Sequence, residues 1–470
     1  MLVIADDAPI STRPDLLVHA LAQLPDDIEL RLPAGVPRGD RLELLAAAYG
    51  VGDRLHIDAE PGDRDGSLVA APGDGRSMAE LVGALGDGVL PASARRGHDG
   101  LFRGHRVAIL TNLATHYRVP LLNGIAARLA AAGAHLRVLF TAARPFSRSY
   151  MAPEPIAFDH EFLRSVSVPV GVDAPLNLER RIRSFSPTVM LVPGFSLAVA
   201  VRAALCARWM RIPYGVWSGA IPQPQTEQPL RGRQRGVLLK RAAFAISYGH
   251  LSADYLRSLA PDVPVVYGRN TTSTLTDLQR VAKDDGLVEV LAVARAIPGK
   301  RLDVAVAAFE HLRDVPCRLT IIGDGTALAA LKQRASGLDN VRFLGAVSSD
   351  RTHEAYGASA IFLFPTSIDV FGLVLVEAMG AGLATVVSST PGAVADLALA
   401  GRNCVVVDGH DPLEWAAAIR SLVEDPQRRR AIGDQARRTV MARWTLDHAV
   451  DAMIAGLRLG VLAGASRGSR

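Results

Sequence analysis

Short apolar runs alternate with amphipathic segments along most of the chain, and the runs fall into two series. Each short, mainly apolar run predicts a buried strand. The expected strands are 106–110, 136–141, 288–293, 318–322, 341–343 and 360–364. Regular alternation with helical segments, such as 121–132, is typical of βαβ units and a parallel sheet. We therefore expect an α/β chain in two units, with the seam in the polar stretch 277–286.

The first hundred residues belong to neither series and contain an internal repeat of the second. Three pairs of segments are parallel: 13–21 with 301–309, 28–32 with 317–321, and 42–57 with 328–343. A Gly- and Arg-rich linker at 94–104 follows. We infer a partial duplicate of the second unit. The alternative is that any two βαβαβ segments look alike at this level.

Composition favours a globular protein with a mild positive charge. The 470 residues are enough for two or three domains, and 49% of them are hydrophobic. With 52 basic and 47 acidic residues, the net charge is +5. This balance suits phosphorylated ligands or an anionic membrane surface, and a basic run at 231–241 points the same way. Ordinary solvated surface is the simpler explanation of most of these charges.

Nothing in the sequence predicts export or a membrane span. Residues 1–7 lack a basic region and turn acidic at once, unlike a signal peptide. The apolar stretch 189–210 is interrupted by Pro193, Gly194 and Arg202. The three cysteines show neither a disulfide framework nor a zinc pattern, which fits a reducing compartment. We expect a cytoplasmic protein, soluble or peripheral to the inner membrane face.

Two cations follow the first strand of the second unit. Arg295 and Lys300 lie in Val-Ala-Arg-Ala-Ile-Pro-Gly-Lys, beyond the carboxyl end of that strand, where α/β sheets bind ligands. Such a pair can straddle a diphosphate and neutralise the charge that develops on a leaving nucleotide. Alone, an Arg and a Lys on a loop are more often solvated surface.

A glycine-rich turn, Ile322-Gly-Asp-Gly, follows a later strand. Gly323 and Gly325 could let a ligand approach the backbone closely. Tight turns between strands and helices use the same residues, so a purely structural role is an equal alternative.

The most specific motif joins a strand end, an acidic loop and a helix start within residues 364–382. Asp369 lies in the loop, where it can accept hydrogen bonds from sugar hydroxyls. The expected helix opens at Phe371, Gly372 and Leu373. The free N–H groups at this end, together with the helix dipole, would make a phosphate site.

Glu377 lies one to two turns inside this helix, within reach of a ribose diol. Its neighbours in the helix are apolar, and an unpaired carboxylate is costly in such surroundings. We therefore expect Glu377 to have a polar partner.

Residues 288–443 resemble the donor domain of glycosyltransferase family 4, a retaining family with the GT-B fold. Its signature is a pair of acids preceded by an Arg and a Lys. The resemblance implies that Arg295 and Lys300 hold the diphosphate and Glu377 the ribose. Asp369, with the backbone at 371–373, would hold the donor sugar. The first acid is Asp instead of Glu, which shortens its reach by one methylene.

The resemblance implies two Rossmann-like domains that face a cleft, with additions at both ends. Residues 1–100 would form a partial Rossmann-like extension and linker, and 101–285 the acceptor domain. Residues 286–445 would form the donor domain, and 446–470 a helix and tail that cross back onto the acceptor domain.

The acceptor half resembles the family more loosely. The loop at 111–120 lacks the Gly-Gly pair of many relatives, so no phosphate contact is carried over. His116 and Arg118 on this loop could meet donor or acceptor, and a surface histidine is an equal alternative. Trp217 stands where many members have a histidine near the reacting carbon, and it is either core or a sugar platform. Asn270 is a candidate for a structural turn at the hinge.

The sequence therefore predicts a retaining glycosyltransferase that uses a nucleotide-diphosphate sugar, with UDP the first expectation and GDP the second. The acceptor would be a hydroxyl of a small molecule, a lipid-linked molecule or a glycan, and no nucleic acid is expected to bind. Catalysis would come mostly from charge stabilisation, without a metal or other cofactor. Asp63-Arg-Asp65 mimics a metal-binding motif but lies outside any strand-end context.

Two other functions are considered. A catalytically silent nucleotide- or sugar-binding scaffold would explain the extra half-domain and the missing glycines, but the intact Arg295, Lys300 and Glu377 argue against it. A GT-B phosphorylase or hydrolase-like relative has no feature in its favour. The extension has Thr12 at the position of Lys300 and no acidic pair, so we expect it to bind no donor and to serve packing or contacts in a homo-oligomer.

Overall fold

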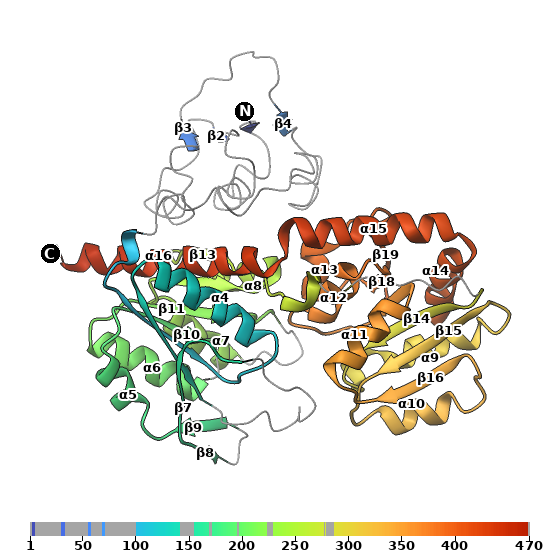
Figure 1. The fold of residues 1–470 in the computed structure, drawn as a ribbon, viewed down its shortest axis with the longest axis horizontal. Coiled ribbons are helices and arrows are strands. Elements are labelled where there is room, and N and C mark those ends of the chain that lie inside the picture. Colours follow the sequence, from blue (N-terminus) through green and yellow to red (C-terminus); the bar gives the residue numbers. More distant parts are fainter. Residues whose placement is uncertain are drawn as a thin grey trace.

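A computed structural model describes most of the chain beyond residue 99. The described residues are 100–141, 155–168, 172–194, 197–222, 229–276, 278 and 286–468, with four short strands nearer the N-terminus. Two α/β domains lie side by side (Figure 1).

The first domain is built on a seven-stranded parallel sheet in the order β13-β12-β11-β10-β5-β6-β7. The strands are β5 (Arg106–Thr111), β6 (His135–Phe140), β7 (Asp159–Phe162), β10 (Val189–Pro193), β11 (Tyr214–Ser218), β12 (Phe244–Ser247) and β13 (Val265–Tyr267). The helices are α4 (Arg118–Ala131), α5 (Leu178–Phe185), α6 (Leu197–Trp209), α7 (Pro229–Leu239) and α8 (His250–Leu259). A separate antiparallel pair joins β8 (Ser165–Val168) to β9 (Val172–Pro175).

Both faces of this sheet are buried, so its strands are apolar almost throughout. Alternate residues of a strand contribute to two different cores: in β5, Val107 and Ile109 pack beneath α4, while Ala108 and Leu110 pack on the side of α5 to α8. The result is a three-layer sandwich with helices on both sides.

The second domain repeats this plan with six parallel strands in the order β16-β15-β14-β17-β18-β19. The strands are β14 (Val288–Val293), β15 (Cys317–Ile322), β16 (Val341–Gly345), β17 (Ile361–Phe364), β18 (Ala384–Ser388) and β19 (Cys404–Val407). The helices are η5 (Pro298–Lys300), α9 (Leu302–Glu310), α10 (Leu328–Arg334), α11 (Ser349–Ala358), α12 (Leu373–Gly380), α13 (Gly392–Leu397), α14 (Pro412–Glu424) and α15 (Pro426–Arg443). Two cores again fill the space on either side of the sheet.

A last helix, α16 (Leu446–Gly468), returns to the first domain and packs on α4, β10 and β12 (Figure 1). Glycines let it approach the sheet closely: a Cβ at Gly456 would lie 2.5 Å from the Ile246 side chain, and one at Gly460 2.6 Å from Val189. Among the described residues, one helical segment, Pro426–Ser466, is long and apolar enough to cross a membrane. Of its most apolar window, 67% is buried inside the protein, as in a core helix.

The four N-terminal strands form a parallel sheet in the order β3-β2-β1-β4. They are β1 (Leu2–Ile4), β2 (Leu30–Leu32), β3 (Leu55–Ile57) and β4 (Leu68–Ala70). The strands β16-β15-β14-β17 of the second domain have the same order. The partial duplicate stays a prediction, because Thr12 and most of residues 1–99 lie outside the described residues.

Candidate active site

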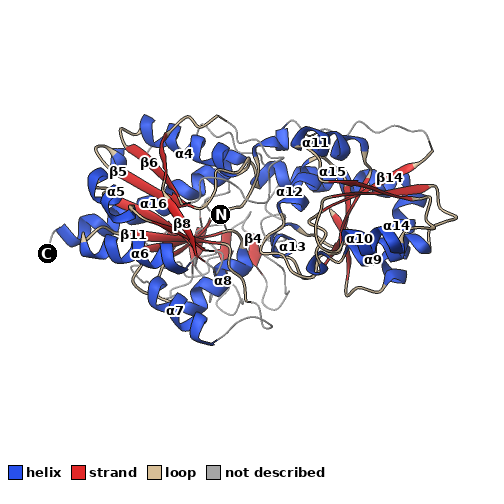
Figure 2. Cartoon of the chain, turned by 90° about the horizontal axis from the view of Figure 1, so that it is seen from below, coloured by secondary structure: helices blue, strands red, loops and turns tan. Residues whose placement is uncertain are grey.

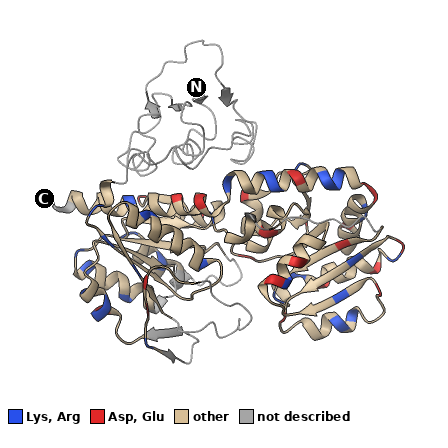
Figure 3. Cartoon of the chain, in the orientation of Figure 1, with Lys and Arg blue, Asp and Glu red and all other residues tan. Residues whose placement is uncertain are grey.

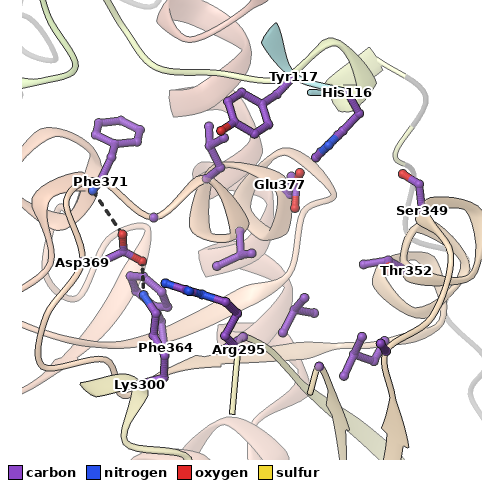
Figure 4. Close-up of a pocket in the computed structure, with 18 of the residues that line it drawn as sticks. His116, Tyr117, Arg295, Lys300, Ser349, Thr352, Phe364, Asp369, Phe371 and Glu377 are labelled. Atoms are coloured by element: carbon purple, nitrogen blue, oxygen red, sulfur yellow. Dashed lines mark hydrogen bonds and ion pairs between the residues drawn. The ribbon is translucent and has the colours of Figure 1, made fainter. Parts of the chain in front are cut away.

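A cleft of about 440 Å³ opens beyond the carboxyl ends of the second-domain strands. Its floor and one wall come from the second domain, and the facing wall comes from the first (Figure 4). Of the ten residues predicted from the sequence, nine line this cleft: His116, Arg295, Lys300, Gly323, Asp369, Phe371, Gly372, Leu373 and Glu377.

The two cations lie on one side of the cleft, on the loop after β14. Lys300 Nζ forms an ion pair with Asp369 Oδ2 at 2.5 Å, and Asp369 Oδ1 accepts a hydrogen bond from the Phe371 N–H at 3.3 Å. Asp369 is thereby held from two sides. Arg295 is exposed, and its side chain extends across the pocket toward Lys300 (Figure 4). Two positive groups thus share the mouth of the cleft with one anchored carboxylate.

The glycine-rich turn positions the arginine loop. Gly323 has φ +135°, and a Cβ there would lie 1.8 Å from the Ala294 carbonyl oxygen. A Cβ at Gly325 would lie 2.4 Å from the Ala296 carbonyl oxygen. The chain's own backbone, on either side of Arg295, therefore occupies the space that both glycines leave. Gly323 also lines the cleft, whereas Gly325 is not among the described residues that do, which favours the structural role for Gly325.

The start of α12 faces the same mouth. Gly372 precedes the helix with φ +102°, and a Cβ there would lie 2.5 Å from the Phe364 ring. The sequence predicted an opening at Phe371 to Leu373, and the helix begins at Leu373. The first N–H groups of a helix have no acceptor within it, and the first two residues of α12, Leu373 and Val374, line the cleft. With the helix dipole they favour an anion such as a phosphate.

Glu377 is buried, with 8% of its surface exposed, and lines the cleft. Its Oε2 accepts a hydrogen bond from the Tyr356 hydroxyl at 3.0 Å, so the expected polar partner is confirmed. Burial raises the pKa of Glu377 to about 7, although the Tyr356 hydrogen bond acts in the opposite direction. Burial, with the nearby Glu377 charge, also raises the pKa of Tyr356 well above its ordinary value. At neutral pH this carboxyl can both accept and donate hydrogen bonds to a diol.

The far end of the cleft was not identified from the sequence. Val347, Ser349 and Thr352 line it from the loop after β16 and the first turn of α11. Two hydroxyl groups beside an apolar side chain can bind a flat polar heterocycle. The sequence did offer one indication: all strands of a parallel sheet end at the same edge, so the loop after the strand 341–343 had to lie beside the other site loops.

The first domain supplies an aromatic wall. His116 and Tyr117 come from the loop after β5, and Tyr248 from the loop before α8. Arg118 lies behind this wall: its guanidinium stacks on the Trp217 ring at 4.0 Å and donates to the Tyr248 hydroxyl at 2.8 Å. Trp217 is 5% exposed and belongs to the core. Asn270 forms part of the hinge turn, where its N–H donates to the Tyr248 carbonyl, and it also lines the cleft.

The described part of the chain contains no group of three or more His, Cys, Asp or Glu that could hold a metal. Asp63 and Asp65 lie outside the described residues. Independence from metals and other cofactors stays a prediction.

Comparison with known sequences matches part of the chain. The family model for glycosyl transferases group 1 matches residues 274–439. A D-inositol 3-phosphate glycosyltransferase of Geodermatophilus obscurus is 33% identical over 223 residues, which cover 44% of this chain and 48% of that protein. A GDP-mannose-dependent alpha-(1-6)-phosphatidylinositol monomannoside mannosyltransferase of Mycobacterium tuberculosis is 26% identical over 44% of this chain and 56% of its own length. The chain thus matches about half the length of these relatives.

Comparison with solved structures covers more of the chain. The Anabaena protein HepE, in complex with UDP-glucose, has a TM-score of 0.59 at 20% identity over 75% of this chain and 98% of its own. Sucrose-phosphate synthase from Thermosynechococcus elongatus has a TM-score of 0.59 at 17% identity over 78% of this chain and 100% of its own. The two parallel sheets and the cleft between them therefore form a GT-B fold.

Proposed function

We propose that the chain transfers a sugar from a nucleotide-diphosphate sugar to a hydroxyl acceptor, with retention of the anomeric configuration. One observation carries the proposal: two cations and a helix N-terminus meet a buried carboxyl within a single cleft between two domains. This arrangement matches the parts of a nucleotide-diphosphate sugar in order.

The diphosphate would lie between Arg295, Lys300 and the start of α12. Lys300 is already close to Asp369, so an arriving phosphate would share this ammonium group with the carboxylate. As the bond to the sugar breaks, negative charge grows on the phosphate and the same groups stabilise it. Glu377 would hold the ribose and Asp369 the donor sugar. Because Asp369 is engaged by Lys300 and by the Phe371 N–H, we assign it a binding role instead of that of a covalent nucleophile.

The nucleobase would lie at the far end of the cleft, beside Val347, Ser349 and Thr352. We propose UDP as the nucleotide, since a protein of the same fold is known with UDP-glucose bound. GDP is the alternative, because one relative is named a GDP-mannose-dependent mannosyltransferase. The names of the relatives favour an acceptor hydroxyl on a phosphorylated or lipid-linked polyol. His116 and Tyr248 would face this acceptor from the first domain.

The alternative is a silent scaffold of the same fold. A thermal-shift panel with UDP-, GDP- and dTDP-sugars separates the two, because a ligand that binds only the folded state raises its melting temperature. We expect a shift with one nucleotide, lost in Glu377→Ala and kept in Glu354→Ala, an exposed change on α11. Radiolabelled transfer to inositol phosphates, with the anomer read by NMR, then tests the reaction. Binding without transfer to any polyol would favour the scaffold.

We also propose that the protein is cytoplasmic and touches an anionic membrane through α5 and α6. The α6 side chains Leu205 and Trp209 are 57% and 72% exposed, and Arg183 of α5 stacks on Trp209 at 4.6 Å. Basic residues gather on this side of the first domain (Figure 3). Exposed apolar side chains next to arginines are suited to an anionic lipid interface.

Co-sedimentation with phosphatidylglycerol vesicles tests the membrane proposal. Wild type should sediment, Trp209→Ala with Leu205→Ser should not, and Leu413→Ser, an equally exposed change on the second domain, should behave as wild type. Equal sedimentation of all three would contradict it, as would binding that is the same with neutral phosphatidylcholine.

A further inference from the structure

A buried carboxylate lies between the two domains, next to the cleft. Asp396 belongs to α13 of the second domain, and its side chain is 1% exposed. Its two oxygens lie 3.0 and 3.2 Å from the backbone nitrogen of His250, which donates to them, and Oδ1 also contacts the His250 Nδ1. His250 opens α8 of the first domain, so the contact joins the domains. Figure 2 shows α8 and α13 side by side at this junction.

The opposing residue leaves room for this contact. A Cβ at Gly249 would lie 2.1 Å from Asp396 Oδ2 and 3.0 Å from the Phe371 ring. The Gly249 backbone is extended, a conformation that any residue adopts, so space is the reason for glycine at this position. The first domain is thus shaped to receive a carboxylate from the second.

The contact stabilises the closed arrangement specifically. A carboxylate at a helix N-terminus satisfies a free N–H and interacts favourably with the helix dipole. Here the helix and the carboxylate belong to different domains. Within the described part of the chain, every recorded hydrogen bond of the Asp396 carboxylate goes to His250. If the domains separated, both partners would exchange these bonds for bonds to water, so the contact favours the closed arrangement by the net value of a charge-assisted hydrogen bond.

Asp396 is also connected to the loop that carries Asp369. The helix α13 begins with two hydrogen bonds to this loop, from the Gly392 N–H to the Asp369 carbonyl at 3.3 Å and from the Ala393 N–H to the Phe371 carbonyl at 2.8 Å. Asp396 lies one turn later on the same helix. The position of the loop and the contact with α8 therefore depend on one rigid element.

We infer that Asp396 is a positioning residue that holds the two domains closed over the cleft. Through α13 it places the loop at Asp369 against α8 and against Tyr248, which directly precedes Gly249 and lines the cleft. The closure itself does not depend on the proposed sugar transfer, and only the kinetic part of the test rests on that function.

Small-angle X-ray scattering of the full chain, with and without UDP, tests closure from both sides of the contact. Asp396→Asn keeps the shape of the side chain and removes its charge, while Gly249→Ala pushes against the unchanged carboxylate. The matched controls are Asp411→Asn, which caps α14 within its own domain, and Gly337→Ala, where a Cβ would meet no atom within 4 Å. Circular dichroism and melting verify that each variant is folded.

We expect both interface variants to have a larger radius of gyration than wild type and both controls to match it. Loss of charge-assisted hydrogen bonds should move the closed-to-open ratio by roughly 10- to 100-fold. With a confirmed donor, kcat should fall about tenfold while the affinity for UDP alone changes less than about twofold, since the diphosphate groups are untouched. Scattering and kcat equal to wild type in Asp396→Asn and in every folded form of Gly249→Ala would overturn the inference. If the interface variants have a larger radius of gyration but no protein shows transfer activity, the inferred role of Asp396 in closure stands and only the proposed function is contradicted.

Discussion

Replacing Glu377 by glutamine should make the protein more stable at alkaline pH and weaken its binding of nucleotide. The carboxyl is 8% exposed and lies in an apolar helix, with one hydrogen bond from Tyr356. Glutamine has almost the same shape and cannot ionise. The variant therefore separates the cost of the buried charge from the packing of the side chain.

The magnitude follows from the pKa of Glu377, which burial raises from an ordinary 4.5 to about 7. The folded state then binds the proton more tightly than the unfolded state, so the stability present below pH 4.5 is lost as the pH rises to about 7. Over this window the loss amounts to about 3 kcal/mol. Glu377→Gln removes this pH-dependent loss. The free energy of unfolding of the variant should therefore equal that of wild type at about pH 4.5 and exceed it by about 3 kcal/mol at pH 8. For a domain of this size that is on the order of 5–10 °C in melting temperature.

Urea unfolding from about pH 5 to pH 8 measures the difference, with the midpoint converted through the slope. Glu354→Gln is the matched control: this carboxylate is 65% exposed on α11, and its pair with Arg351 is a surface contact worth at most about 1 kcal/mol. The same proteins in a nucleotide titration should show about 10- to 100-fold weaker binding for Glu377→Gln, because a charge-assisted hydrogen bond to the ribose is lost.

A stability difference that does not change with pH would refute the reasoning, since it would mean that Glu377 ionises in the folded protein as it does in the unfolded chain. A variant less stable than wild type at pH 8 would refute it more directly. If stability is unchanged but nucleotide binding is weaker, the proposed ribose contact of Glu377 stands and the proposed energetic cost of burying its charge is wrong.

Three further predictions concern neighbouring groups. If the proposed transfer is correct, Lys300→Ala should lower its rate by roughly 10²- to 10³-fold, as loss of a charge-stabilising donor does, measured as kcat with the donor that the thermal-shift panel identifies. Gly323→Ala should destabilise the second domain by about 3 kcal/mol, seen as a lower melting temperature, because a Cβ would lie 1.8 Å from the Ala294 carbonyl oxygen. Tyr356→Phe should raise the pKa of Glu377 further, since the hydroxyl's hydrogen bond lowers it, and urea unfolding should then show the loss of stability extending to higher pH.

Each of these has a matched comparison. Lys332→Ala, an exposed change on α10, should leave transfer unchanged. Gly337→Ala should leave the melting temperature within about 1 °C, because a Cβ there meets no atom within 4 Å. A Lys300→Ala enzyme with normal kcat, or a Gly323→Ala protein that melts with wild type, would contradict the corresponding contact.

Local patterns predicted six of the thirteen strands in the two main sheets. The expected strands 318–322 and 360–364 are observed at Cys317–Ile322 and Ile361–Phe364, within one residue at each end. The helix expected at 121–132 begins earlier, at Arg118. The pattern of apolar and polar residues indicates which positions of an element are buried. It therefore predicts the location of an element better than the residue at which a helix begins.

The predicted residues on the second-domain side of the cleft follow strands of one parallel sheet, and such strands end at a common edge. Val347, Ser349 and Thr352 follow another strand of the same sheet and were missed, because no local motif marks them. The turn pattern does not separate Gly325 from Gly323, since both satisfy it, and of the two only Gly323 is among the described residues that line the cleft. The sequence did not decide whether Trp217 is a core residue or a platform for a sugar. Its burial in the structure shows that it is a core residue.

By itself, the sequence determined the α/β class, the division into two units and the polar groups that gather at one sheet edge, because each depends on residues close together in the chain. The tertiary structure decided which distant groups meet. Tyr356 reaches Glu377 across 21 positions, and His250 reaches Asp396 across 146. Such pairs arise from the packing of one helix on another and from the approach of two domains, which no local pattern encodes. The state of the buried carboxyl and the closure of the cleft therefore appear only when the chain is folded.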